Sequence, residues 1–258
     1  MANYGVILES KPLNGKIALV TGGSRGIGRA ISLKLADMGA TVCINFLKSR
    51  DSAEDTLQKV HEKSSESILI RGNVGNRKNI EKIFKTIEEK FGKLDLFISN
   101  AALGVFADVK DVDEKAWNLA MDVNAKSLLY GAQKAADLMT DGGKIIALTS
   151  MGTTRYVPGY ASIATSKAAI ETLVKYIAIE YNSMGITCNA VSGGFVETDS
   201  LKAFPDYEDI YREAIRRTPS EKIASPDDIA GVVSLLCLPE SGWITGQIIV
   251  ADGGFTLI

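Results

Sequence analysis

A chain of 258 residues suffices for one large α/β domain, and its 46% hydrophobic and 23% charged residues are typical of a protein with an extensive core. The 29 basic and 31 acidic residues give a net charge of −2, which argues against nucleic-acid or anionic-membrane partners, because both attract clustered positive charge. Three scattered cysteines and a single histidine offer no metal-ligand spacing, so we expect no metal and a reducing compartment.

Residues 1–13 are expected to form an N-terminal extension ahead of a domain at 14–258. The extension lacks a basic stretch followed by an apolar run, so it does not resemble a signal peptide. No apolar run approaches the ~18 residues of a membrane span. We therefore expect a cytoplasmic protein.

Short apolar runs then alternate with helix-length segments. Strands are predicted at 16–21, 41–46, 67–71, 94–99, 144–149, 186–191 and 247–250. Helices are predicted to follow the first strand up to 38 and to occupy about 52–63, 78–91, 114–139 and 160–184. This alternation predicts a single doubly wound Rossmann domain with a parallel seven-stranded sheet covered on both faces. Residues 199–218 interrupt the rhythm and are the candidate substrate lid.

The segment Thr21-Gly-Gly-Ser-Arg-Gly-Ile-Gly28 lies between the first predicted strand and the first predicted helix. Its glycines, Gly22, Gly26 and Gly28, allow a tight turn and a close approach of the backbone to a pyrophosphate. The helix that follows supplies free N–H groups and a favourable dipole. The spacing differs from the general G-x-G-x-x-G pattern, so the position after a strand carries the assignment.

The end of the second strand indicates which dinucleotide binds. NAD enzymes usually place an acid there for the ribose 2′-hydroxyl, but no acid occurs before Asp51. Arg25, Lys48 and Arg50 instead offer positive charge for a 2′-phosphate, although Arg50 also fits a solvated loop face. The sequence therefore predicts NADPH.

The glycine turn resembles that of the short-chain dehydrogenase/reductase family. Further landmarks follow in order: Asn73-Val74, Ser99-Asn-Ala-Ala102, Asp122-Val-Asn-Ala125, Gly246-Gln247 and Asp252-Gly-Gly254. The resemblance covers about 16–254. It implies homotetramers, or dimers, built on the two long helices. It also implies cofactor contacts from Gly22, Ser24, Arg25, Gly26, Ile27, Gly28, Lys48, Ser49, Asn73, Val74, Asn100, Ala101, Ala102, Lys167, Gly193, Gly194, Val196 and Thr198.

One departure from the family pattern concerns the catalytic tyrosine. The usual motif is Tyr-x-x-x-Lys, but Ile163 stands four residues before Lys167, and the tyrosine is Tyr160. Seven residues, like four, place both side chains on one helical face. This spacing, together with Gly193 in place of a usual proline, resembles the enoyl-acyl carrier protein reductases, in particular the enoyl reductase III of Bacillus-type bacteria.

The resemblance implies roles for individual side chains. Tyr160 would stabilise the enolate oxygen, Lys167 would hold the nicotinamide ribose, Ser150 would orient the substrate, and Asn124 would belong to a proton relay. Ser150 equally fits a strand end, and Asn124 a structural hydrogen-bonding residue. The implied substrate contacts are Tyr156, Tyr160 and Phe204, with packing as the alternative for Tyr156.

The leading hypothesis is therefore an NADPH-dependent 2-enoyl-thioester reductase whose substrate is carried by acyl carrier protein or coenzyme A. The alternatives are a reductase of ketones or 3-oxoacyl thioesters and a non-catalytic NADP-sensing protein. Retention of both Tyr160 and Lys167 argues against the last. Acyl-chain length stays open, as does the choice between fatty acid biosynthesis in lipid metabolism and a specialised pathway.

Overall fold

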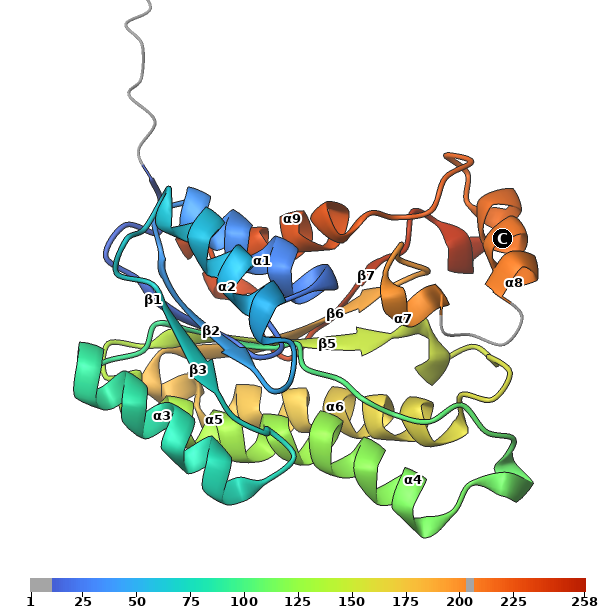
Figure 1. Cartoon of the computed structure of the whole chain (residues 1–258), viewed down its shortest axis with the longest axis horizontal. Coiled ribbons are helices and arrows are strands. Elements are labelled where there is room, and N and C mark those ends of the chain that lie inside the picture. Colours follow the sequence, from blue (N-terminus) through green and yellow to red (C-terminus); the bar gives the residue numbers. More distant parts are fainter. Residues whose placement is uncertain (1–10, 203–206) are drawn as a thin grey trace, which may run out of the picture.

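The computed structural model describes residues 11–202 and 207–258 (Figure 1). Its seven parallel strands are β1 (Ile17–Val20), β2 (Thr41–Phe46), β3 (Ile68–Arg71), β4 (Leu96–Ser99), β5 (Gly143–Ser150), β6 (Ile186–Gly193) and β7 (Ile248–Ala251). They pair in the order β3-β2-β1-β4-β5-β6-β7. The predicted doubly wound sheet is confirmed, and each strand lies within two residues of its predicted bounds.

Helices cover both faces of the sheet (Figure 1). One layer contains α1 (Gly26–Asp37), α2 (Arg50–His61) and α9 (Pro226–Leu236). The other contains α3 (Arg77–Phe91), α4 (Glu114–Ala120), α5 (Ser127–Leu138) and α6 (Ala161–Glu180). Each layer encloses its own apolar core, so both faces of the central strands are buried. Leu13 is 1% exposed and packs into the α1–α9 core, so the packed domain includes the last residue of the expected extension.

Two helical features differ from the sequence-based expectation. The run expected at 114–139 contains a π-helical segment, Met121–Lys126, between α4 and α5. Helix α9 was not predicted, although its start carries a clear signal. Ser225 and Asp228 form a reciprocal capping box, and Pro226 occupies the first turn.

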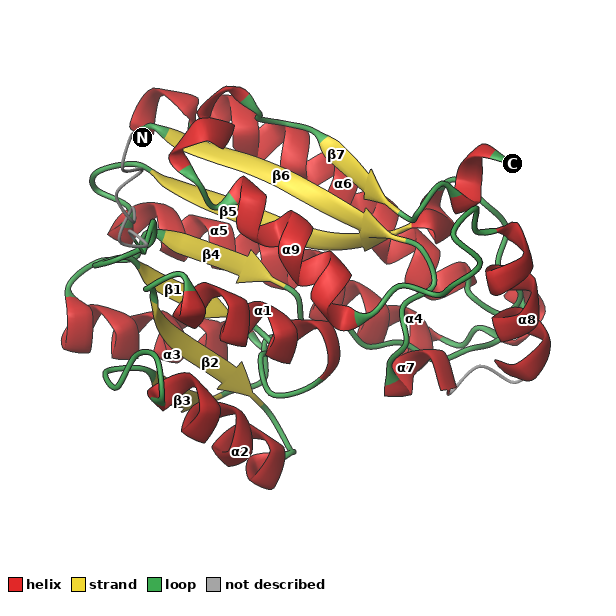
Figure 2. Ribbon diagram, turned by 90° about the horizontal axis from the view of Figure 1, so that it is seen from above, coloured by secondary structure: helices red, strands yellow, loops and turns green. Residues whose placement is uncertain are grey.

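The strand order reverses between β1 and β4, which are neighbours although their crossovers run to opposite sides. Ligands of doubly wound sheets bind at such a switch point, beyond the C-terminal ends of the strands. Figure 2 shows the short helices α7 (Asp199–Lys202) and α8 (Tyr207–Arg217) beyond the arrowheads of β5 and β6. The described helices include none with the length and apolar character needed to cross a bilayer.

Candidate active site

The glycine turn after β1 forms a concave stretch of backbone, the glycine cradle, which has no room for side chains at Gly22 and Gly28. Gly22 has φ +63°, and a Cβ there would lie 3.1 Å from the Ala101 Cα. A Cβ on Gly28 would lie 2.2 Å from the Gly22 carbonyl oxygen. Close approach therefore requires glycine at both positions, and the positive φ adds a conformational requirement at Gly22.

Buried amides anchor this cradle to the neighbouring strands. Asn100 donates from Nδ2 to the Thr21 carbonyl at 2.8 Å and to the Gly22 carbonyl at 3.3 Å. On the other side, the Asn45 Oδ1 accepts from the Gly22 N–H at 3.4 Å, while its Nδ2 donates to carbonyls of Ile70 and Gly72 at 3.1 Å. Asn45 was not predicted as a site residue, because β2 reads as an apolar strand and only the fold turns this side chain toward the turn.

The first turn of α1 fits an anion. No side chain caps its N-terminus, and its first turn contains no acid. The N–H groups and the helix dipole are thus available to a phosphate. Arg25 is the N-cap residue of α1, and Lys48 follows the end of the neighbouring strand β2. Both are exposed, and neither forms an ion pair among the described residues. Arg50, in contrast, is held by Glu54 at 2.7 Å, which matches the solvated-face alternative. The cradle therefore fits a phosphorylated dinucleotide.

The remaining predicted cofactor contacts come from strand ends near the turn. Thr198 lies beside it, because a Cβ on Gly26 would be 3.5 Å from the Thr198 methyl group. Gly193 ends β6 in register with Ser150 of β5. The Asn73 side chain accepts from the Gly75 N–H at 3.0 Å. The other members of the set are Ser24, Ile27, Ser49, Val74, Ala101, Ala102, Gly194 and Val196, all within the described chain.

Tyr160 occupies the N-cap of α6, one residue before the helix begins. Burial raises the pKa of its phenol, and a hydrogen bond with the Ser150 side chain partly opposes that shift. Its ring stacks on Phe106 at 6.0 Å between centroids. The phenol therefore stays protonated near neutral pH and is available as a hydrogen-bond donor.

Lys167 is buried in α6, and its Nζ donates to the Leu148 carbonyl of β5 at 2.7 Å. Desolvation lowers its pKa from 10.5 to about 8. Both predicted partners thus contact the end of β5, Tyr160 through Ser150 and Lys167 through Leu148. Buried titratable groups whose pKa is shifted this far occur often at functional sites.

Ile163 is 7% exposed and packs against Gly104. Asn124, in the π-helical segment, accepts from the Leu103 N–H at 2.9 Å and donates to Ser166 Oγ at 2.8 Å. Ser166 immediately precedes Lys167, so Asn124 braces the lysine-bearing turn of α6. π-Helical segments are frequent at functional sites.

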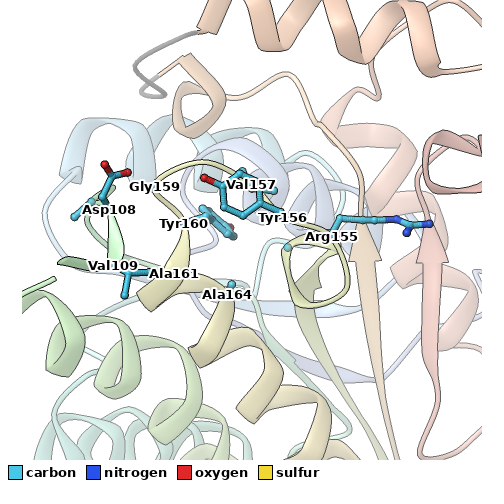
Figure 3. Close-up of a pocket in the computed structure, with 11 residues that line it drawn as sticks. Asp108, Val109, Arg155, Tyr156, Val157, Gly159, Tyr160, Ala161 and Ala164 are labelled. Carbon is cyan, nitrogen blue, oxygen red and sulfur yellow. The ribbon is translucent and has the colours of Figure 1, made fainter. Parts of the chain in front are cut away.

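A pocket of about 180 Å³ lies beside Tyr160. It is lined by Ala107, Asp108, Val109, Gly152, Arg155, Tyr156, Val157, Gly159, Tyr160, Ala161 and Ala164. Figure 3 shows Asp108 and Val109 on one side, while Arg155 extends away to donate to the Thr256 carbonyl at 2.7 Å. Tyr156 lines the pocket and is 88% exposed, so it is not a core residue. Phe204 lies outside the described residues. Among the described residues no cluster of histidine, cysteine and acidic side chains suits a metal ion.

Known proteins resemble this chain over nearly its whole length. The family model described as enoyl-(acyl carrier protein) reductase matches residues 22–256. The 1-cyclohexenylcarbonyl-CoA reductase of Streptomyces collinus is 35% identical over 94% of this chain and 88% of its own length. Versicolorin reductase stcU of Emericella nidulans is 37% identical over 94% and 96%. The crystal structure of angucycline C-6 ketoreductase LanV with bound NADP superimposes with a TM-score of 0.88 at 30% identity, covering 96% of this chain and 98% of that one.

Proposed function

The chain belongs to the short-chain dehydrogenase/reductase family, and on that premise we propose that this NADPH-dependent reductase acts on the carbon–carbon double bond of 2-enoyl thioesters. The observation that carries the proposal is the placement of Tyr160. Tyr160 lies at the N-cap of α6, and its phenol is hydrogen-bonded to the Ser150 side chain. The position that holds the tyrosine in the usual family motif is occupied by the buried Ile163.

NADPH, when bound, supplies the hydride that adds to the β-carbon of the enoyl group. The double-bond electrons then move onto the thioester oxygen, and the α-carbon afterwards takes a proton from the solvent. The Tyr160 phenol donates a hydrogen bond to that oxygen where negative charge develops. Its raised pKa keeps the proton in place for this role. Donors preorganised toward a developing oxyanion are among the largest contributions to catalysis.

The neighbouring side chains orient these groups. Lys167, whose Nζ donates to the Leu148 carbonyl, would hold the nicotinamide ribose when the cofactor is bound. Ser150 fixes the direction of the phenol, and Asn124 braces the helix turn that carries Lys167. A reductase for enoyl groups needs its donor further from the nicotinamide than a carbonyl reductase does. The three residues between Tyr160 and position 163 correspond to about 4.5 Å along a helix, which shifts the donor by more than the offset between the carbonyl carbon and the β-carbon.

The relatives support two substrate classes. The name 1-cyclohexenylcarbonyl-CoA describes a thioester conjugated to a carbon–carbon double bond, which favours the enoyl proposal. LanV is a ketoreductase, which favours the second candidate, carbonyl reduction on ketones or 3-oxoacyl thioesters. The placement of Tyr160 and Ile163 supports the first candidate here. Coenzyme A and acyl carrier protein are both proposed as carriers.

The test is product identity. Purified protein is incubated with NADPH and crotonyl-CoA or crotonyl-acyl carrier protein, and the acyl product is identified by mass spectrometry. A butyryl thioester supports the proposal. Absence of any reduction, with acetoacetyl thioester reduced in the same preparation, rejects it.

Two further features complete the proposal. The 199–218 segment, of which α7 and α8 are described, acts as a lid, which predicts lower hydrogen exchange in α8 when NADPH and an acyl ligand bind.

The α4–α6 layer mediates homo-oligomers, because Tyr176 and Ile179 on α6 are 64% and 76% exposed. Light scattering coupled to size exclusion tests the second point, and a monomer would reject it.

A further inference from the structure

A carboxylate that no motif assigns lies next to the catalytic elements. Glu171 stands one helical turn after Lys167 on α6 and is half-buried against the end of β5. None of the ion pairs among the described residues includes it, so its charge is not used in a surface salt bridge. Its hydrogen bonds run instead to the segment that carries Ser150.

One carboxylate oxygen of Glu171 accepts hydrogen bonds from the hydroxyls of two threonines. Thr149 Oγ1 donates to Oε1 at 2.8 Å, and Thr153 Oγ1 lies 2.9 Å from the same atom. The two threonines flank Ser150, one before it in β5 and one after it in the following turn. A single atom of α6 therefore ties both sides of Ser150 to the helix. Hydrogen bonds to an ionised carboxylate are about twice as strong as neutral ones.

The position of Ser150 depends on this turn. Its Oγ accepts from the Gly152 N–H at 3.2 Å, and its carbonyl oxygen lies 3.0 Å from Thr153 Oγ1. The same serine side chain is hydrogen-bonded to the Tyr160 phenol. Thr153 has one hydroxyl proton, so Glu171 and the Ser150 carbonyl share its donation. The chain of contacts runs from Glu171 through Thr153 and Ser150 to Tyr160.

We propose that Glu171 is a positioning residue that clamps the Ser150 turn against α6 and so fixes the Tyr160 phenol for catalysis. The inference rests on the proposed use of Tyr160 as the donor. The carboxylate touches neither substrate nor cofactor, and it acts through the two threonine hydroxyls. Its loss should therefore lower kcat far more than it changes the NADPH Kd, because the glycine cradle follows β1, on the other side of the switch point from β5.

The experiment compares Glu171→Ala, Glu171→Gln, Thr153→Val and the double variant Glu171→Ala with Thr153→Val. Glu180→Gln, at the exposed end of the same helix, is the matched control. Each is assayed for kcat, KM, NADPH Kd and Tm with whichever of crotonyl-CoA and acetoacetyl-CoA the wild type reduces faster. That choice keeps the test independent of substrate class.

We expect Glu171→Ala to lower kcat roughly 10- to 100-fold, the scale on which small displacements of a catalytic group act. Glu171→Gln, which keeps an acceptor oxygen, should restore most of that loss. The double variant should resemble Glu171→Ala, because the residues act in one chain and their effects on kcat are not additive. Glu180→Gln should match the wild type.

Two results would overturn the inference: an unchanged kcat in folded Glu171→Ala, or losses in the double variant that multiply as for independent sites. If Glu171→Ala does not fold, Glu171→Gln and Thr153→Val carry the same comparison. Tyr160→Phe, run in parallel, separates the two proposals. Full activity in Tyr160→Phe rejects the proposed donor, whereas an inactive Tyr160→Phe beside a fully active Glu171→Ala rejects only the positioning role.

Discussion

Ile163 fills the space directly over Gly104: a Cβ on Gly104 would lie 2.2 Å from Ile163 Cγ1. The side chain at position 163 is therefore committed to packing, and the proposed catalytic phenol, that of Tyr160, comes from the helix cap three residues earlier. This packing separates the site from one built on Tyr-x-x-x-Lys.

The first prediction concerns Ile163→Tyr. A larger ring has no room over Gly104, so the variant should lose about 1–3 kcal/mol of stability, as is typical for overpacked cores. It should not become an efficient reductase of acetoacetyl thioester. Thermal unfolding and kcat/KM with acetoacetyl-CoA measure both effects. A stable variant with high acetoacetyl activity would contradict the reasoning.

The second prediction is that Tyr160→Phe lowers kcat about 10²–10³-fold, the loss commonly measured when one oxyanion donor is removed. Phenylalanine keeps the ring that stacks on Phe106, so folding should persist. NADPH binding, followed by fluorescence, should be unchanged. A variant with normal turnover would show that another group stabilises the thioester oxygen.

The third prediction concerns the 2′-phosphate. Arg25 is exposed at the N-cap of α1 and Lys48 is exposed just after β2, so the wild type should prefer NADPH over NADH. Lys48→Ala should reduce the preference about 10-fold, since a charge-assisted contact contributes about 1.5–3 kcal/mol. Arg50→Ala is the control and should change the cofactor preference little, because Arg50 forms a salt bridge with Glu54. Equal kcat/KM for both cofactors in the wild type would reject the assignment.

The fourth prediction is a pH dependence of NADPH binding. Burial lowers the pKa of Lys167 to about 8, so its ammonium is present below that pH and is lost as the pH rises through it. If the ammonium holds the ribose, the NADPH Kd should increase above pH 8. The raised pKa of Tyr160 keeps the phenol protonated in this window. Lys167→Met should bind NADPH more weakly, with a Kd that no longer changes above pH 8. If the pH dependence of the Kd persists in this variant, a group other than Lys167 causes it.

Much of the fold could be predicted from the sequence, because buried parallel strands appear as short apolar runs between helical segments. The π-helical segment at Met121–Lys126 could not, since its register depends on the contacts that Asn124 makes with Leu103 and Ser166. Helix α9 begins with a local signal, the Ser225 capping box, but it follows the 199–218 segment, where the alternation of strands and helices breaks down, so the alternation does not predict it.

The candidate site likewise contains residues that local motifs predict and residues that only the folded structure reveals. The motifs predicted Tyr160, Lys167 and the glycine turn, since each depends on residue type and local spacing. Three other features of the site join segments that are distant in sequence. They are the hydrogen bonds of Asn45, the stacking of Phe106 on Tyr160 and the hydrogen bonds that Glu171 accepts from Thr149 and Thr153. Only the packed fold brings those pairs together, so no local pattern identifies them.

The central claim is tested most directly by the ratio of kcat/KM for crotonyl thioester to that for acetoacetyl thioester, measured with NADPH on one enzyme preparation and the same carrier. The placement of Tyr160 ahead of α6, with Ile163 packed on Gly104, predicts a ratio well above one. Ready turnover of acetoacetyl thioester with no reduction of crotonyl thioester would contradict the enoyl proposal and establish carbonyl reduction in its place.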